Sequence, residues 1–379
     1  MERGGTARRR IGSTGAEKRL RRKIFDNPLP TSQFRPVDSR GQRDLNARVG
    51  LIVLCLLAAA LGLMLGPTDL SWSQIGHALL HQADGPTNTI IWNLRLPRLL
   101  LGALVGSALA ISGAALQGLF RNPLADPALI GVSSGSAVGA VTAVVLGSRW
   151  AWPPWLEAWL LPFCALAGGL VVTWLIYRLA RGSVESRVLT LLLVGLALNA
   201  LAAALVGMML YLANDAQLRR FTFWTLGSLE AATWERCAAL TLIVVPGLVV
   251  LPRMAKPLNA LLLGEAAAYH LGVSVESVRR VVIFGCAWMV AGAVASSGMI
   301  GFVGLVVPHM VRLLLGPDHR RLLPWSAVAG GAVLVLADVA ARIVDPPRVL
   351  PIGLLTALVG APFFLWLVWR DQRWREGES

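Results

Sequence analysis

Long stretches without Asp, Glu, Lys or Arg dominate the chain and alternate with short charged segments. These uncharged stretches cover residues 49–68, 99–120, 127–148, 158–177, 188–214, 237–252, 281–311, 322–337 and 349–369. A helix needs about 20 residues to cross the hydrocarbon core of a bilayer. The pattern therefore predicts an all-α polytopic membrane protein.

One stretch, 281–311, is too long for a single ordinary crossing. It contains Ser296-Ser297-Gly298 and Gly301, small residues that suit a tight reversal. Splitting it there predicts about ten transmembrane helices. Glycines also recur at helix-packing spacing, at 102 and 106, at 135 and 139, and at 298, 301 and 304. Each set alone fits ordinary packing, but together they favour a compact bundle.

Composition and charge agree with a membrane protein. Of 379 residues, 55% are apolar and only 15% are charged, which excludes an ordinary soluble enzyme. The net charge is +14, but residues 1–48 alone carry eleven Arg, two Lys and five acidic residues. Most other basic residues lie between apolar stretches, so the charge does not predict a nucleic-acid-binding face.

The distribution of Lys and Arg predicts the orientation. With the N-terminus inside, 14 basic residues beyond the tail lie on the inner side and eight on the outer side, which places both termini in the cytoplasm. Residues 1–46 are expected to form a disordered basic tail, with no cleavable signal peptide. Residues 47–370 form the transmembrane domain, and 371–379 form a cytoplasmic C-terminal tail.

Candidate chemistry is sparse. There is no catalytic set, no Walker loop for ATP and no metal-binding motif, and the four cysteines are expected to be small buried residues. Asp338 and Arg342 lie four apart on one helix face, where we expect them to neutralise each other. His77 and His81 have the same spacing on a segment expected to be helical, 71–81. A solvated helix face is favoured there over a metal or haem site.

The longest inner connection, 253–280, is a candidate contact with a partner. Ala260–Leu271 can form one short helix, and Gly264 and Gly272 could break or cap it. Its small and acidic residues suit docking into a partner's groove, although a plain interfacial helix is the alternative.

Four blocks in the chain resemble the permease family of type II ABC importers, which take up iron-siderophores, haem and cobalamin. They are Arg95-Leu96-Pro97-Arg98; Gly113 to Gln117 with Arg121-Asn122-Pro123-Leu124-Ala125 and Gly131-Val132-Ser133; Leu263-Gly264-Glu265 with Leu271-Gly272-Val273; and Gly301 to His309 with Gly316 to Arg321, Ala337-Asp338, Pro351-Ile352-Gly353 and Gly360-Ala361-Pro362. The similarity runs from about residue 47 to 370.

The resemblance implies a homodimer with its pathway on the two-fold axis. Two ATPase subunits, which would hold ATP and Mg²⁺, are expected inside, and a periplasmic substrate-binding protein outside. This chain would carry no cofactor and no catalytic residue. Family arginines that pair with glutamates of the binding protein match Arg95, Arg98 and Arg342. Interfacial snorkelling is the alternative for Arg95 and Arg98.

The resemblance also implies three further sets of site residues. Coupling to the ATPases would involve the region 257–273, with Leu258, Leu263, Gly264, Glu265, Ala268, Leu271 and Gly272. The cytoplasmic gate would match Asn122, Leu124, Glu185 and Ser186, although Glu185 departs from the small hydroxyl residue expected there. The pathway helix, about 188–212, carries Asn199, Met208, Met209 and Tyr211, and its apolar, soft lining suits a large flat ligand. Buried packing is the alternative for each methionine.

The substrate prediction is haem, because residues 213–229 look most like the haem-importing branch of the family. Siderophore permeases share the second half of that segment, so a ferric siderophore or cobalamin remains the alternative. An ion-coupled secondary transporter would need inverted repeats and ion sites at broken helices, and neither is evident. The expected function is therefore an importer permease in the bacterial inner membrane, in contact with lipid and not with nucleic acid.

Overall fold

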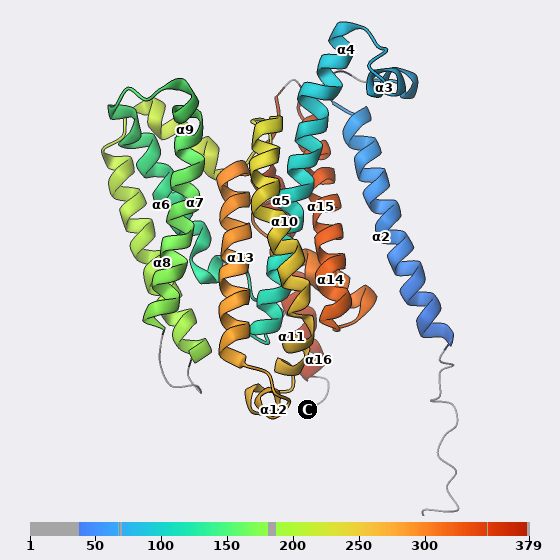
Figure 1. Ribbon diagram of the computed structural model, residues 1–379, viewed down its shortest axis with the longest axis vertical. Coiled ribbons are helices and arrows are strands. Elements are labelled where there is room, and N and C mark those ends of the chain that lie inside the picture. The colour runs from blue at the N-terminus through green and yellow to red at the C-terminus, as the bar shows by residue number, and fades with distance from the viewer. Residues whose placement is uncertain (1–37, 67, 69, 181–186, 347, 377–379) are drawn as a thin grey trace, which may run out of the picture. The chain divides into compact units, whose positions relative to one another are not determined.

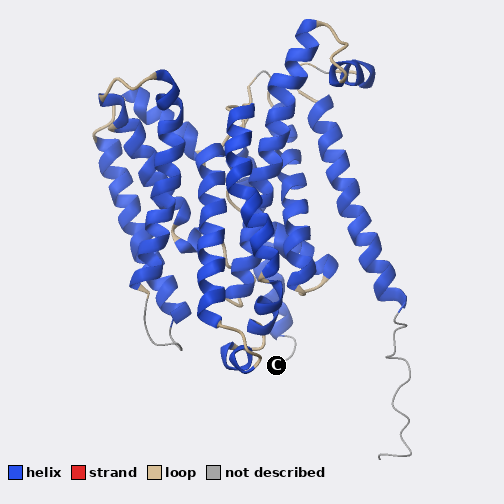
Figure 2. Ribbon diagram, in the orientation of Figure 1, coloured by secondary structure: helices blue, strands red, loops and turns tan. Residues whose placement is uncertain are grey.

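The computed structural model describes residues 38–66, 68, 70–180, 187–346 and 348–376, and the chain divides into the units 1–46 and 47–379. Most of the predicted tail, together with Glu185 and Ser186, lies outside the described residues. Every regular element in the described ranges is helical, which confirms the all-α prediction (Figure 2). The last helix continues to Glu376, beyond the predicted start of the C-terminal tail at residue 371.

Seven described helices are long and apolar enough to cross a membrane. They are α2 (Asp38–Met64), α5 (Leu96–Leu119) with the preceding α4 (Gly85–Thr89) and π-helical η2 (Ile90–Arg95), α7 (Pro154–Leu179), α8 (Arg187–Tyr211), α10 (Trp234–Arg253), α13 (Val275–Ser297) and α15 (His319–Ile343). Two shorter apolar helices, α6 (Val132–Val145) and α14 (Val303–Leu315), and the apolar part Ile352–Trp366 of α16 (Ile352–Glu376) occupy the remaining predicted stretches. Helix length alone therefore does not confirm ten crossings.

Short helices and turns connect these elements. They are α3 (Trp72–Leu79), η3 (Pro127–Ile130), η4 (Gly147–Arg149), α9 (Asp215–Thr225), α11 (Ala255–Leu261) and α12 (Glu265–His270). The predicted break in 281–311 is confirmed, because α13 ends at Ser297 and α14 begins at Val303. Gly298 and Phe302 both adopt positive φ angles, 74° and 66°, in the connection.

Helix α5 is the central helix of residues 47–379. It packs against α15, α13, α14 and α10 (Figure 1). Every residue from Ala108 to Leu119 is buried. A second group, α6 to α9, is joined to it through α13, which contacts both α5 and α7. The C-terminal half of α5 is therefore surrounded by other helices of the chain and not by lipid.

Glycines allow this close packing. A Cβ at Gly106 would collide with the Gly330 carbonyl of α15, and one at Gly113 with the Gly304 carbonyl of α14. Gly135 and Gly139 of α6 meet Gly168 and Cys164 of α7 in the same way. The predicted packing role is confirmed for Gly106, Gly135 and Gly139, whereas a Cβ at Gly301 of the third predicted set would meet nothing within 4 Å.

A polar contact crosses the buried core between α5 and α14. The Nη2 of Arg312 donates to Oε1 of Gln117 at 2.8 Å, and the Gln117 amide donates to the Leu305 carbonyl at 3.3 Å. Gln117 is almost completely buried. Because an unpaired amide is costly in a medium without water, both of its ends need these partners.

Candidate functional site

The three arginines predicted to dock a binding protein are engaged within the chain. Nε of Arg98 donates to Oδ1 of Asp338 at 2.8 Å and to Oδ2 at 3.0 Å, and Nε of Arg342 lies 3.1 Å from Oδ2 of the same carboxylate. Asp338 is only 3% exposed and Arg342 is 6% exposed. The expected neutralisation of Asp338 by Arg342 is confirmed, and Arg98 is a second partner that the sequence did not reveal.

Arg95 is directed inward in the same region. It is 4% exposed, and its guanidinium donates to the Leu63, Met64 and Thr68 carbonyls at the end of α2 and beyond it. Arg342 also donates to the Leu65 carbonyl, at 3.1 Å. Contact of these arginines with a partner's glutamates would require them to exchange partners, so the docking role stays a prediction.

The two histidines of the segment 71–81 lie in different local structures. Ser71 and Gln74 form a capping box at the start of α3, but this helix ends at Leu79, before His81. His81 has φ 56° and stacks on Trp92 with ring centroids 4.6 Å apart. His77 and His81 therefore do not share a helix face, and no cluster of three metal-ligand side chains occurs among the described residues.

The predicted pathway residues of α8 divide into two pairs. Met208 and Tyr211 are 61% and 88% exposed, so their side chains project away from the chain. Asn199 instead accepts a hydrogen bond from Ser134 Oγ of α6 at 2.5 Å, and Met209 packs, half-buried, against a small core cluster. Asn199 and Met209 therefore hold α8 in place, whereas Met208 and Tyr211 belong to its exposed face.

The described part of the predicted gate is a turn after α5. Oδ1 of Asn122 accepts a hydrogen bond from the Leu124 amide at 2.9 Å, and the Asn122 carbonyl accepts one from Ala125 at 3.1 Å. Asn122 thus fixes the turn that presents the exposed Leu124 side chain. This geometry would suit the predicted gate, because the turn fixes the position of one exposed apolar side chain.

The predicted coupling region is two short helices and not one. Gly264 has φ 108° and separates α11 from α12, and Gly272 has φ 79° after α12. A φ of 108° lies outside the helical region, so Gly264 breaks the helix within Ala260–Leu271, which is one of the two outcomes left open on sequence. Leu258 and Ala268 are buried and anchor the two helices.

The three most exposed apolar side chains of this region form what we call the coupling surface: Leu263, Tyr269 and Leu271. Leu263 is 71% exposed although it follows a helix whose other leucines, Leu258 and Leu261, are buried. Large exposed apolar side chains at one end of a bundle are typical of an interaction site. The geometry thus agrees with a partner that covers α12.

A buried arginine ties α12 to the bundle. Nη2 of Arg279 in α13 lies 2.8 Å from Oε1 of Glu265, the first residue of α12, and Nη1 lies 3.0 Å from Oε2 of Glu276. The Tyr177 hydroxyl of α7 donates to the same Glu276 carboxylate. We call this group the Arg279 clamp, because one guanidinium connects α12 to α13 and, through Glu276, to α7.

A second contact holds α11. The Asn259 amide donates to Oδ1 of Asp318 at 2.6 Å, and its Oδ1 accepts from the His319 backbone N–H at 3.0 Å. Asp318 caps α15 by accepting from the Arg320 N–H at 3.0 Å. This N–H and the Asn259 amide hold the pKa of the Asp318 carboxyl below its ordinary value. Asn259 thereby joins α11 to the start of α15.

The sequence profile of the FecCD transport family matches residues 52–370. The chain belongs to the FecCD transport family. This FecCD-family permease is 40% identical over 334 residues to the hemin transport system permease protein HmuU of Yersinia pestis, with 87% of this chain and 97% of the relative covered. It is also 40% identical over 337 residues to the vitamin B12 import system permease protein BtuC of Shigella boydii, with 88% and 99% covered.

A solved structure has the same fold as this chain. The permease superposes with a TM-score of 0.76, at 35% identity and over 85% of this chain, on an inward-facing conformation of a metal-chelate type ABC transporter. That structure is covered over 98% of its length. The resemblance read from the four sequence blocks is therefore confirmed, and the family membership argues against an ion-coupled transporter.

The sequence did not identify the two residues, Arg279 and Asn259, that attach the coupling region to the other helices of this permease. Arg279 was recognised only as a basic residue of an inner loop, and Asn259 had no assigned role. The Asp318 cap carried a local signal, since Asp after Gly-Pro before a helical stretch is a typical N-cap. Arg279 carried a local signal only for Glu276, three residues earlier on the same helix, because Glu265 lies 14 residues away in α12.

Proposed function

We propose that this chain is the permease subunit of an ATP-driven importer that carries haem across the bacterial inner membrane by alternating access. The match over nearly the full length of a hemin transport permease carries this proposal. The segment 213–229, which favours the haem-importing branch on sequence alone, supports it. A vitamin B12 permease is equally identical, so cobalamin is the second candidate. A ferric siderophore is the third, because the structural relative is of metal-chelate type.

The working assembly we propose is a homodimer of ten-crossing subunits with both termini in the cytoplasm. Two ATPase subunits, which bind ATP and Mg²⁺, would cover the coupling surface, and a substrate-binding protein would dock at the opposite end. The long row of exposed leucines on α8, including Leu189, Leu193 and Leu196, supports a second copy or the pathway on that face. Large apolar faces of this kind suit a buried interface or a hydrophobic channel.

Within this assembly Met208 and Tyr211 would line the pathway, and Asn199 and Met209 would position α8. Asn122 and Leu124 would form part of the inner gate together with residues 185 and 186. The two polar contacts of the coupling region, through Arg279 and Asn259, would transmit closure of the ATPases to α13 and α15. The transport step is a rigid-body rearrangement, with no covalent chemistry on this chain.

Uptake into proteoliposomes tests the proposal. The permease, its ATPase and its binding protein would be reconstituted together, and haem, a ferric siderophore and cobalamin would be compared at equal concentration. Haem uptake that requires ATP and stops with a hydrolysis-deficient ATPase is expected. ATP-dependent uptake of only one of the other ligands would replace the substrate and retain the class. Uptake driven by an ion gradient without ATP would overturn the class.

A further inference from the structure

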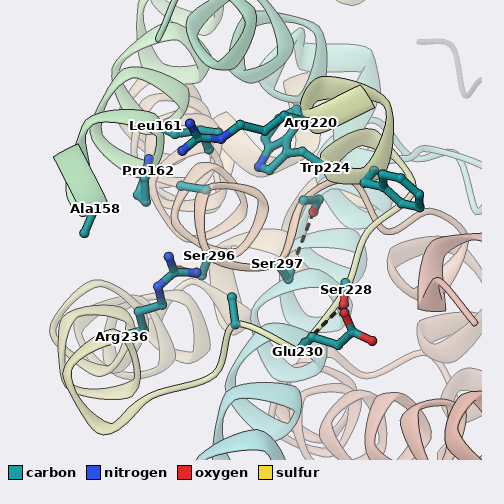
Figure 3. Close-up of a pocket in the computed structure, with 14 residues that line it drawn as sticks. Ala158, Leu161, Pro162, Arg220, Trp224, Ser228, Glu230, Arg236, Ser296 and Ser297 are labelled. Carbon is teal, nitrogen blue, oxygen red and sulfur yellow. Dashed lines mark hydrogen bonds between the residues drawn. The ribbon is translucent and has the colours of Figure 1, made fainter. Parts of the chain in front are cut away.

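A pocket of about 280 Å³ lies at the end of α13 opposite the coupling region. Helices α7, α9 and α10 and the loop 228–231 complete its wall. Figure 3 shows Arg220 of α9 and Arg236 of α10 approaching it from different sides, Arg220 beside Trp224 and Arg236 beside Ser296. None of the residues predicted for docking, gating or coupling lines this pocket.

The pocket holds positive charge without an internal counter-ion. Neither the Arg220 nor the Arg236 guanidinium makes a hydrogen bond or ion pair with a described residue, whereas the three arginines near Asp338 are all engaged. The buried indole nitrogen of Trp224 also has no partner among the described residues. The remaining charged lining residue, Glu230, directs its carboxylate toward Ser228 and away from both guanidinia (Figure 3).

The serines at the pocket floor do not compete for these donors. The Ser296 hydroxyl donates to the Gly292 carbonyl at 2.9 Å, and the Ser297 hydroxyl donates to the Ala293 carbonyl at 2.9 Å. An occupant would therefore receive hydrogen bonds from two guanidinium groups and one indole. Guanidinium groups suit the oxygens of a phosphate group, which they can contact in a bidentate way.

An uncharged strip leads away from the pocket along α13. Trp288 and Val281 lie seven and fourteen residues before the lining residue Ala295, hence on the same helix face, and both are exposed. No charged residue occurs on α13 between Val281 and Ser297 or on α10 between Cys237 and Pro252. At 1.5 Å per residue the strip is about 20 Å long, which matches an acyl chain that extends toward the bilayer centre.

We infer that this pocket binds the headgroup of an anionic phospholipid, with the phosphate between Arg220 and Arg236 and an acyl chain along the strip. The unpaired charge selects an anion, and the adjoining apolar surface selects one that carries a hydrocarbon chain. A carboxylate from a docking protein would satisfy the arginines but would leave the strip of α13 uncovered. The inference does not depend on which ligand the importer carries.

Native mass spectrometry of the delipidated full-length permease tests the inference. We expect phosphatidylglycerol to remain bound at concentrations where phosphatidylcholine, which has no net charge, dissociates. R220Q/R236Q should weaken phosphatidylglycerol binding about tenfold or more, since it removes two charge-assisted donors. R219Q is the matched control, because Arg219 is an exposed neighbour on α9 that does not line the pocket.

Two further measurements keep the assignment falsifiable. Trp224→Phe removes the indole donor and retains an aromatic ring, and it should weaken binding severalfold even if the double variant fails to fold. Glycerol phosphate, which lacks the acyl chains, should not compete at the same concentration. Equal binding of phosphatidylcholine, or equal loss in R219Q and R220Q/R236Q, would overturn the inference. Competition by glycerol phosphate would make the pocket a soluble-anion site.

Discussion

Arg279 and Glu265 form the direct link between α12 and the buried face of α13, with 2.8 Å between Nη2 and Oε1. The arginine is 4% exposed at its side chain, and the glutamate is more accessible at 24%. A displacement of α12 therefore acts on a charged group that cannot move into water. If a partner docks at the coupling surface, as proposed above, this pair is the route by which a displacement of α12 would reach α13.

The clamp predicts uncoupling when the guanidinium is removed. Arg279→Gln should lower ATP-driven uptake about tenfold, because α12 can then move without moving α13, while ATP hydrolysis by the assembled complex persists. Uptake and hydrolysis would be measured on the same proteoliposomes. Arg253→Gln is the control, since Arg253 is an exposed basic residue near this end whose guanidinium donates to the Val249 carbonyl. Parallel loss of uptake and hydrolysis in Arg279→Gln would contradict the coupling role.

Removing the charge of Asp338 should strongly lower the stability of the folded chain, because two arginines pair with this carboxylate. Asp338→Asn leaves Arg98 and Arg342 without a carboxylate in a buried setting, and it should lower the unfolding free energy by about 3 kcal/mol. Thermal unfolding in detergent measures the change. Asp345→Asn, which removes an exposed carboxylate at the end of the same helix, should have little effect. A similar Tm for both variants would show that the buried pairs contribute no net stability.

The docking prediction is now best tested at Arg98. Arg98→Gln should weaken binding of the substrate-binding protein about tenfold if the guanidinium exchanges Asp338 for a partner's carboxylate. Asp338→Asn breaks the same internal pair but keeps the arginine, so docking should be retained or strengthened in that variant. Affinities would be measured by surface plasmon resonance on nanodiscs. Unchanged affinity in Arg98→Gln would leave this residue with an internal role alone.

Asn259 predicts a stability effect that depends on pH. Asn259→Ala removes the amide bonded to the Asp318 carboxylate and should lower the unfolding free energy by about 1–3 kcal/mol at neutral pH. Because the pKa of Asp318 is lowered in the folded chain, its contribution is complete above the unfolded value of about 4 and fades as the pH falls through the folded value. The Tm deficit of Asn259→Ala should therefore shrink in acid. A deficit that is constant from pH 7 to pH 3 would assign it to the hydrogen bond that Asn259 accepts from the His319 backbone N–H, which does not titrate.

The packing of α5 predicts intolerance to a single methyl group. Gly113→Ala places a Cβ against the Gly304 carbonyl, so α5 and α14 must separate, at a cost of roughly 1–3 kcal/mol. Gly50→Ala is the control, because nothing lies within 4 Å of a Cβ at that position in α2. The Tm of both variants would be measured in the same detergent. Equal values would show that the core relaxes around the added carbon.

The apolar stretches were predictable because water and lipid impose a simple length rule. The break after Ser297 followed from the same rule, since a run of 31 residues exceeds one crossing. The exposure of each helix was harder to predict, because α5 and α8 are both apolar although one is buried by protein and the other exposes leucines. The abundance of Gly, Ala and Ser in α5 was the available signal.

Site contacts between distant residues were not predictable. Arg98 and Asp338 are 240 residues apart, and no local pattern links them. The family resemblance selected both arginines and the coupling segment, but it could not show that the Arg98 guanidinium is already paired. The break at Gly264 was one of two possibilities on sequence, and the positive φ angle decides it.

The position of Gln117 has a consequence for synthesis of the chain. Its partners Leu305 and Arg312 follow it by 188 and 195 residues, so at about 5–20 residues per second they emerge some 10–40 seconds later. During that interval the amide of α5 must be satisfied by water or by the insertion machinery, because an unpaired amide in hydrocarbon is costly. Helix α5 therefore enters its final surroundings only when the last fifth of the chain arrives. A chain truncated before residue 305 would lack both hydrogen-bond partners of Gln117, so α5 could not reach its native packing.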